Sequence, residues 1–258
     1  MTYFEWGMDP AIVAIGPLQI RWYGVWFALA FLLGYYFMKW IYTREKQQNR
    51  NLDLLLIYLV AGTLIGARLG HCLFYDPGYY LAHPWKIAAV WEGGLASHGG
   101  GIGALISLYL YTLKTRESWL WLLDRIAMPA CLAGALIRLG NFFNSEIAGL
   151  PASVPWAIIF ERIDAVPRHP AQLYEALAYL AVWVILVIVY TRKKAAARSG
   201  LIFGLFLVLV FVSRILVEFV KIPQEAYLHN FSLNTGQMLS IPFLLAGGVL
   251  LIQALNKN

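Results

Sequence analysis

The stretch GLIFGLFLVLVFVSRILVEFV, residues 200–220, decides the fold class of this chain. It is apolar apart from one serine and two charged residues, Arg214 and Glu218. Because an α-helix rises 1.5 Å per residue, about 20 such residues cross the hydrocarbon core of a bilayer, which is about 30 Å thick. The stretch therefore predicts a membrane-spanning helix.

Six further apolar runs are long enough, or nearly long enough, to span a bilayer. They lie at about 22–42, 54–75, 98–113, 119–141, 171–190 and 237–255. The run at 98–113 is short and spans only if its glycines are embedded as well. We therefore predict an all-α polytopic membrane protein with about seven transmembrane helices, built as a single integral-membrane domain over residues 1–258.

The composition excludes a soluble enzyme and a disordered chain. Hydrophobic residues make up 60% of the sequence and charged residues 13%, which is about half the charged share of a soluble domain. The net charge of +6 would indicate nucleic acid in a soluble protein, but here it fits basic cytoplasmic loops, so no nucleic-acid partner is expected. Both cysteines, Cys72 and Cys131, lie in apolar stretches, and we expect no disulfide, metal or cofactor.

The basic residues alternate between loops along the chain. Most lie in the loops near 43–52, 114–118 and 191–199, and few lie in the intervening segments at 76–97, 143–169 and 221–236. Since cytoplasmic loops carry the Lys and Arg excess, we expect the N-terminus outside and the C-terminus in the cytoplasm. No Lys or Arg precedes Arg21, so a cleaved signal peptide is not expected. The outer segments are rich in Pro, Trp and Tyr, which predicts a small extracytoplasmic cap and a site facing the outer half of the membrane.

Several polar residues lie within or beside the apolar runs, where each charge near the bilayer centre costs about 2.5–3.5 kcal/mol. They are Arg68, His71, His98, Asp124, Arg125, Arg138, Asn141, Glu146, Glu175, Arg214 and Glu218. Some have structural explanations. Arg214 and Glu218 are four residues apart and can neutralise each other on one helix face. Arg125 and Asp124 lie near the cytoplasmic end of their helix, where a long side chain such as that of Arg125 can extend to the membrane surface.

Arg138 and Asn141 are harder to explain structurally. They are three residues apart and share a helix face, and Gly140 lets a ligand or a neighbouring backbone approach closely. A guanidinium flanked by amides suits an anionic lipid headgroup, because it can grip a phosphate through two hydrogen bonds. The alternative is an internal polar network that holds helices together.

The glycine-rich segment at 91–103 is the second part of the sequence that indicates a functional site. No strand pattern precedes it, so it does not indicate a dinucleotide-binding loop. Close helix packing explains Gly101 and Gly103. It does not explain His98, a titratable group near an outer helix end and a candidate general base.

The stretch RLGNFFNSEIAG, residues 138–149, resembles the signature of the bacterial prolipoprotein diacylglyceryl transferases, which reads Gly-Arg-x-Gly-Asn-x-x-Asn-x-Glu-x-x-Gly. Further matching blocks follow the order of the chain: Arg21–Gly24, Trp91–Gly94 with Ser97–Gly100, Arg168–Glu175, Arg214–Glu218 and Gly236–Pro242. The resemblance runs from about residue 9 to residue 250, nearly the whole chain.

The resemblance implies transfer of the diacylglyceryl group from phosphatidylglycerol to the lipobox cysteine thiol of a prolipoprotein, which forms a thioether and releases glycerol phosphate. The implied partners are phosphatidylglycerol, prolipoprotein signal peptides with a lipobox cysteine, and membrane lipids. The implied location is the bacterial cytoplasmic (inner) membrane.

The same resemblance implies roles for individual residues. Arg138 matches the arginine that binds phosphatidylglycerol, Arg214 matches a second essential arginine, and His98 matches a catalytic position. The other implied site residues are Tyr23, Asn141, Glu146, Gly149 and Glu218. Asp124 matches an acidic position that we expect to be structural. Since a free thiol has a pKa near 8.5, His98 is expected to take its proton while the arginines bind the phosphate.

The sequence departs from the family pattern at two positions. Ile137 stands where the signature has glycine, and Val210 stands where other members have tyrosine, so the lipid pocket is expected to differ in shape. The competing interpretation is an anionic-lipid-binding or transport protein without covalent chemistry, because intramembrane arginines and glycine-broken helices suit it equally well. Transporters of that kind often contain internal repeats, and this sequence shows none.

Overall fold

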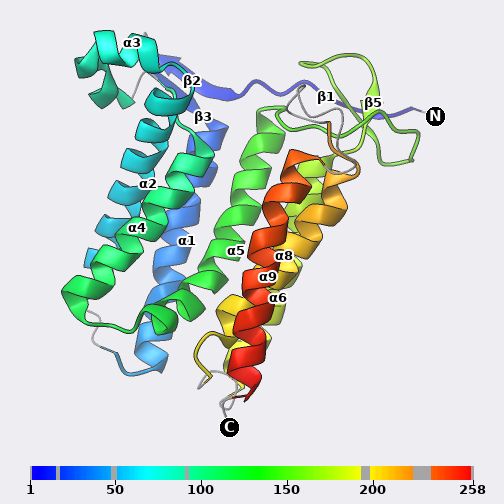
Figure 1. Cartoon of the computed structure of the whole chain (residues 1–258). Coiled ribbons are helices and arrows are strands. Elements are labelled where there is room, and N and C mark those ends of the chain that lie inside the picture. The colour runs from blue at the N-terminus through cyan, green and yellow to red at the C-terminus, as the bar shows by residue number, and fades with distance from the viewer. Residues whose placement is uncertain are drawn as a thin grey trace. The chain divides into compact units, whose positions relative to one another are not determined.

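The computed structural model describes residues 2–15, 18–47, 51–90, 93–192, 198–222 and 234–256. Long helices make up most of this part of the chain (Figure 1). They are α1 (Trp22–Arg44), α2 (Leu52–Phe74), α4 (Ser97–Thr115), α5 (Trp119–Phe143), α6 (Ala171–Thr191), α8 (Leu201–Glu218) and α9 (Thr235–Asn256). Each lies within a few residues of a predicted apolar run, so the helix positions are confirmed.

Six of these helices are long and apolar enough to cross a membrane: within the described residues they are α1, α2, α5, α6, α8 and α9. The 19-residue helix α4 is not among them, because it begins with the polar, glycine-rich sequence Ser97-His98-Gly99-Gly100-Gly101. The chain is therefore a multi-pass membrane protein with six candidate spans. The count of seven that the sequence suggested depends on α4.

Short strands are the feature that the all-helical prediction missed. A three-stranded sheet has the order β1-β4-β5, and β2 pairs with β3 in an antiparallel hairpin. The strands are β1 (Phe4–Trp6), β2 (Ala11–Ile15), β3 (Leu18–Arg21), β4 (Ile158–Phe160) and β5 (Pro167–Arg168). Strands of two to five residues are too short to show the alternating pattern by which strands are recognised in a sequence. The fold is thus mostly helical with two small sheets.

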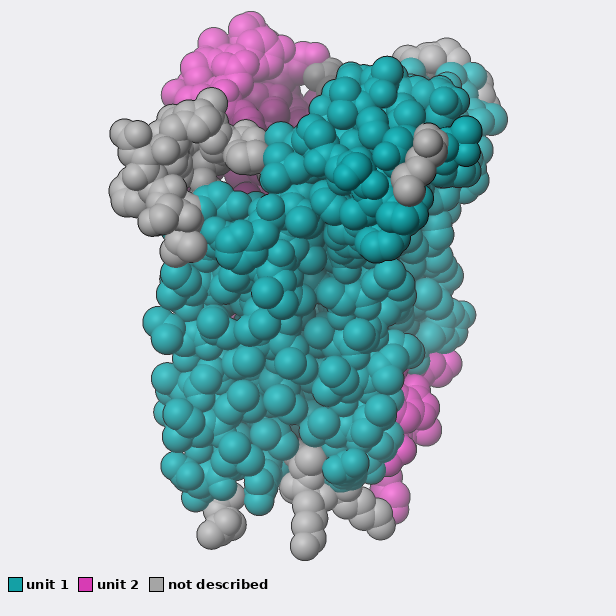
Figure 2. Space-filling view, turned by 90° about the vertical axis from the view of Figure 1, so that its right-hand side faces the viewer, with its two compact units in different colours: residues 1–36, 123–258 teal, residues 37–122 magenta. Residues whose placement is uncertain are grey.

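The chain divides into two compact units, coloured separately in Figure 2. Unit 1 comprises residues 1–36 and 123–258, and unit 2 comprises residues 37–122. In unit 1, helices α8 and α9 pack closely because Gly204 and Gly247 have no side chains to separate them. A Cβ on Gly204 would lie 3.1 Å from the carbonyl oxygen of Gly247.

Asp124 anchors the start of helix α8. Its carboxylate accepts hydrogen bonds from the backbone N–H groups of Gly200 (2.7 Å) and Phe203 (2.8 Å), which lie at the beginning of that helix. The first N–H groups of a helix have no partner within it, and a carboxylate there satisfies them and complements the helix dipole. Asp124 is fully buried, and its role is the structural one expected from the sequence.

In unit 2, helices α2 and α4 touch backbone to backbone through glycines. A Cβ on Gly66 would lie 2.7 Å from the Cα of Gly103, and a Cβ on Gly70 would lie 2.8 Å from the Cα of Gly99. The packing predicted for Gly103 is therefore present. The packing predicted for Gly101 is not, because a Cβ there would meet no atom within 4 Å. Two short helical segments, α3 (Pro77–Ala82) and the 3-10 helix η2 (Pro84–Ala88), lie between α2 and α4 along the chain.

Candidate functional site

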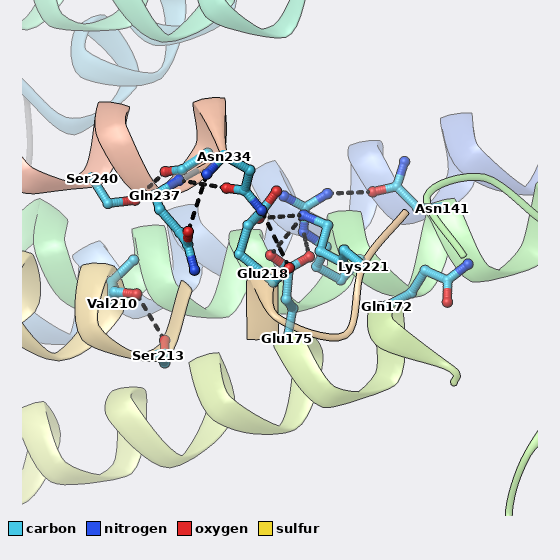
Figure 3. Close-up of polar contacts among 12 residues, drawn as sticks. Asn141, Gln172, Glu175, Val210, Ser213, Glu218, Lys221, Asn234, Gln237 and Ser240 are labelled. Carbon is cyan, nitrogen blue, oxygen red and sulfur yellow. Dashed lines mark hydrogen bonds and ion pairs between the residues drawn. The ribbon is translucent and has the colours of Figure 1, made fainter. Parts of the chain in front are cut away.

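A chain of buried charges lies in unit 1, where α5 and α8 end and α6 begins (Figure 3). Glu175, only 1% exposed, is its centre. One carboxylate oxygen, Oε2, lies 2.8 Å from Nε of Arg138, and the other, Oε1, lies 3.4 Å from Nζ of Lys221. Lys221 is also 3.2 Å from Oε2 of Glu218. Two cations and two carboxylates thus join three segments that are distant in sequence.

A second branch of polar contacts runs from Arg138 to the end of α5. Nη1 of Arg138 donates to Oδ1 of Asn141 at 2.9 Å, which confirms that the two side chains share a helix face. Nδ2 of Asn141 donates to Oε2 of Glu146 at 3.1 Å, and Nδ2 of Asn144 donates to the other carboxylate oxygen at 3.0 Å. Asn141 is buried whereas Glu146 is exposed, so this branch leads from the interior to the surface.

The backbone around Glu146 is held in an unusual conformation. Ser145 (φ 55°) and Ile147 (φ 58°) are both left-handed, although neither is glycine. Such residues cost about 1–3 kcal/mol each and persist where the surroundings fix them. Here the N–H of Glu146 donates to the carbonyl of Asn141 at 2.9 Å, and Nε2 of the fully buried Gln172 donates to the carbonyl of Glu146 at 2.5 Å. The turn therefore presents the Glu146 carboxylate in one orientation.

Three glycines permit close approach around these charges. A Cβ on Gly140 would lie 2.9 Å from Cδ2 of Tyr23, so this glycine lets α1 bring Tyr23 against α5. A Cβ on Gly149 would lie 2.6 Å from the carbonyl oxygen of Val220, next to Lys221 in the chain. A Cβ on Gly236 would lie 2.5 Å from the carboxyl carbon of Glu218. Each glycine is needed for packing at the site.

Arg214, on helix α8, has no hydrogen bond or ion pair with another described residue. Its suggested pairing with Glu218 does not form, because Lys221 takes that carboxylate instead. The Tyr179 hydroxyl is hydrogen-bonded to Arg138 and also interacts electrostatically with Arg214. Tyr179 therefore lies near both arginines, and no carboxylate among the described residues neutralises the half-buried Arg214.

The structure therefore gathers most of the residues expected at the site within unit 1. They are Tyr23, Arg138, Asn141, Glu146, Gly149, Arg214 and Glu218. His98 belongs to unit 2, at the second residue of α4. Its imidazole is exposed and has no hydrogen-bond partner among the described residues.

Sequence reasoning missed Lys221 and gave no role to Glu175 or Gln172. In the sequence Lys221 is only one of the few basic residues of the outer segments. Its spacing of three residues from Glu218 was the available signal, since such pairs meet on one side of a helical turn. Glu175 is one of the charges that stand out within the apolar runs, but its partners lie in distant segments, on α5 and just after α8, and no local spacing reveals them.

The helices and the buried ionic cluster define a multi-pass membrane protein with a polar site at the ends of its helices. Residues 10–253 match the family model for prolipoprotein diacylglyceryl transferase, and the chain belongs to this family.

Three relatives carry the name phosphatidylglycerol–prolipoprotein diacylglyceryl transferase. The protein from Tolumonas auensis is 50% identical over 248 residues, covering 96% of each chain. The protein from Chloroherpeton thalassium is 48% identical, covering 99% of this chain and 96% of the relative. The protein from Porphyromonas gingivalis is 46% identical, covering 100% of this chain and 96% of the relative.

Proposed function

We propose that this protein transfers the diacylglyceryl group of phosphatidylglycerol to the lipobox cysteine thiol of a prolipoprotein. Membership of the family supports this activity, as do the names of relatives at 46–50% identity. The observation that carries the proposal is Arg214, a half-buried cation that acts electrostatically on Tyr179, as Arg138 does, and that no carboxylate neutralises among the described residues.

The charge balance around Glu175 supports phosphate binding at Arg214. Glu175 and Glu218 offset the charges of Arg138 and Lys221. Arg214 has no carboxylate partner among the described residues, so an anion bound beside it would pair directly with its charge. A phosphodiester carries one negative charge, and arginine binds phosphate oxygens through parallel N–H donors. Arg138, oriented by Glu175 and Asn141, is proposed as the second arginine for the same phosphate.

The proposed reaction is a substitution at a glycerol carbon. The cysteine sulfur forms a bond to that carbon, and the bond between the carbon and the phosphate oxygen breaks. The electron pair leaves with the oxygen, so the products are a thioether and glycerol phosphate. Arg138 and Arg214 would stabilise the negative charge on the departing phosphate, which is more effective in a site of low dielectric than in water.

His98 is proposed as the base. The thiolate is the nucleophilic form of cysteine, and a thiol with a pKa near 8.5 is mostly protonated at neutral pH. The exposed imidazole of His98 can accept that proton and later release it to water or to the phosphate product. Tyr23, Asn141, Glu146, Gly149 and Glu218 are proposed to shape and orient the lipid headgroup site.

We further propose how the chain lies in the membrane. Helix α4 is taken as a seventh span, with the N-terminus outside and the C-terminus in the cytoplasm of a bacterial cell, as one domain over residues 1–258 in the cytoplasmic membrane. The distribution of Lys and Arg among the loops supports this orientation. The site would then face the outer half of the bilayer beneath a small extracytoplasmic cap, since α5 and α8 end there.

A mass measurement tests the proposed function. The purified protein in liposomes containing phosphatidylglycerol is mixed with a lipobox peptide, and the peptide mass is followed. A gain of one diacylglyceryl group is expected. It should be absent with Arg138→Ala and with a peptide whose cysteine is replaced by serine. Lipid binding without a mass gain at any pH would contradict the proposal and favour a lipid-binding or transport protein.

A further inference from the structure

Arg68 is a buried cation in unit 2 whose hydrogen bonds go to backbone carbonyls. It lies on α2 and is 3% exposed. Nε donates to the carbonyl of Ile87 at 2.9 Å, and Nη2 donates to that of Lys86 at 2.5 Å. Nη1 donates to the carbonyls of Gly93 at 2.5 Å and Gly94 at 3.3 Å. Among the described residues no carboxylate pairs with it.

These four carbonyls come from the two ends of one loop. Lys86 and Ile87 belong to η2, whereas Gly93 and Gly94 lie just before α4. A single guanidinium therefore holds η2 together with the end of the loop that leads from η2 into α4. The face of the guanidinium also lies over the ring of Tyr80, with Cζ 5.1 Å from the ring centre.

Two glycines at the end of the loop have backbone conformations that favour glycine, and one of them leaves no room for a side chain. Gly93 (φ 89°) and Gly94 (φ 71°) are both left-handed, a conformation that favours glycine. A Cβ on Gly94 would lie 2.6 Å from Cδ2 of His71 and 2.8 Å from Nη1 of Arg68, whereas a Cβ on Gly93 would meet nothing within 4 Å. The side chains of His71 and Arg68 together therefore leave no room for a Cβ at Gly94.

Further contacts fix the backbone on both sides of His98. The N–H of Ala96 donates to the carbonyl of Ala67, the neighbour of Arg68, at 2.9 Å. Gly99 packs directly against Gly70, one turn further along α2. Between these two fixed points the side chain of His98 stays exposed. The backbone of His98 is therefore held while its imidazole remains accessible.

We infer that Arg68 is a positioning residue for the transfer reaction: by binding the carbonyls of Lys86, Ile87, Gly93 and Gly94 it holds the start of α4 so that His98 can take the thiol proton. This inference rests on the proposed function. Arg68 itself touches no reacting atom. Its effect on the rate passes through the placement of His98.

A double-mutant cycle tests the inference. The rates of thioether formation are compared for Arg68→Lys, His98→Gln and the double variant, in liposomes with phosphatidylglycerol and a lipobox peptide. Lysine keeps the charge but lacks the fork that reaches four carbonyls. We expect kcat to fall at least about tenfold in Arg68→Lys with KM for the lipid unchanged, and to fall less than about twofold when that change is added to His98→Gln. Arg116→Lys, an exposed control in unit 2, should keep full activity.

A peptide with selenocysteine in place of cysteine distinguishes two roles for Arg68: positioning His98 and stabilising the fold in general. A selenol is ionised at neutral pH and needs no base, so Arg68→Lys and His98→Gln should both approach the wild-type rate with it. If Arg68→Lys fails to fold, Gly94→Ala replaces it, because a Cβ at Gly94 would press on Nη1 of Arg68 and on the ring of His71. The control is Gly78→Ala, at a glycine of unit 2 where a Cβ would meet no atom within 4 Å. Gly94→Ala should lose activity with the cysteine peptide and recover it with the selenocysteine peptide, and Gly78→Ala should keep the wild-type rate with both.

Three results would overturn the inference. Arg68→Lys or Gly94→Ala could retain the wild-type rate, the loss could repeat in full on the His98→Gln background, or the selenocysteine peptide could give no recovery. In each case a wild-type protein that forms the thioether leaves the proposed function standing. A wild-type protein that forms no thioether with either peptide would overturn both.

Discussion

Arg138 on α5 and Glu175 on α6 form an ion pair, with Nε of the arginine 2.8 Å from Oε2 of the carboxylate. The side chain of Glu175 is 1% exposed and that of Arg138 is 15% exposed. A buried charge pair of this kind gives limited net stability, because both charges lose their hydration. Its main effect is to fix the orientation of the side chains, and here it orients the Arg138 guanidinium that we propose for phosphate binding.

The first prediction concerns this pair. Glu175→Gln keeps the size of the side chain but removes its charge, so Arg138 loses the partner that orients it. We expect the rate of thioether formation to fall about 10- to 100-fold, since small displacements of a binding group are costly in catalysis. Glu5→Gln, which removes an exposed carboxylate from unit 1, is the control and should be neutral. Unchanged kinetics in Glu175→Gln would show that Arg138 needs no such orientation.

The second prediction concerns Lys221, which lies between Glu175 and Glu218. Lys221→Met leaves two buried carboxylates without a common cation. Removing one partner of a buried ion pair typically costs about 3–5 kcal/mol, so the thermal unfolding midpoint in detergent should fall by many degrees. Lys221→Arg keeps the charge and should fall much less. A Lys221→Met protein as stable as wild type would mean that these carboxylates are not charged together.

The third prediction concerns the left-handed turn at Ser145. Ser145→Gly removes the steric cost of a positive φ and also removes a buried hydroxyl that has no hydrogen-bond partner among the described residues. We expect the protein to gain about 1 kcal/mol in stability with transfer activity retained. Ser145→Ala removes the hydroxyl but keeps the backbone cost, so it separates the two contributions. A lower unfolding midpoint in Ser145→Gly would show that the turn is not strained.

The fourth prediction is a pH dependence at the surface. Hydrogen bonds from the Arg168 guanidinium lower the pKa of the Asp164 carboxyl below its ordinary value. A pKa that is lower in the folded protein stabilises it above the ordinary carboxyl value of about 3.9, and this contribution disappears as the pH falls through the folded value. Wild type should therefore be more stable than Asp164→Asn at neutral pH. The difference should vanish in acid, and a difference that persists at pH 2 would contradict this.

The positions of the long helices could be predicted from the sequence because each is marked by an apolar run, and for all of them except α4 that run has membrane-spanning length. The pairing of Arg138 with Asn141 was also predictable, because it depends only on a spacing of three residues within one helix. Such local relationships are set by helix geometry and need no knowledge of the rest of the fold.

Relationships between distant segments could not be predicted in this way. Lys221 meets Glu175 across 46 positions of the chain, and that contact exists only after the helices pack. Arg68 binds backbone carbonyls, which every residue carries, so no residue type in the loop signals its partners. The suggested pairing of Arg214 with Glu218 was geometrically possible, but Lys221 competes successfully for that carboxylate.

The central claim is that the bond between the glycerol carbon and the phosphate breaks as the thioether forms, with Arg214 stabilising the phosphate that leaves. The most direct test measures both products at once, from phosphatidylglycerol labelled in its headgroup and a lipobox peptide. The account predicts glycerol phosphate and thioether in equal amounts, and neither product with Arg214→Ala. Thioether without glycerol phosphate, or equal yields with Arg214→Ala, would contradict it.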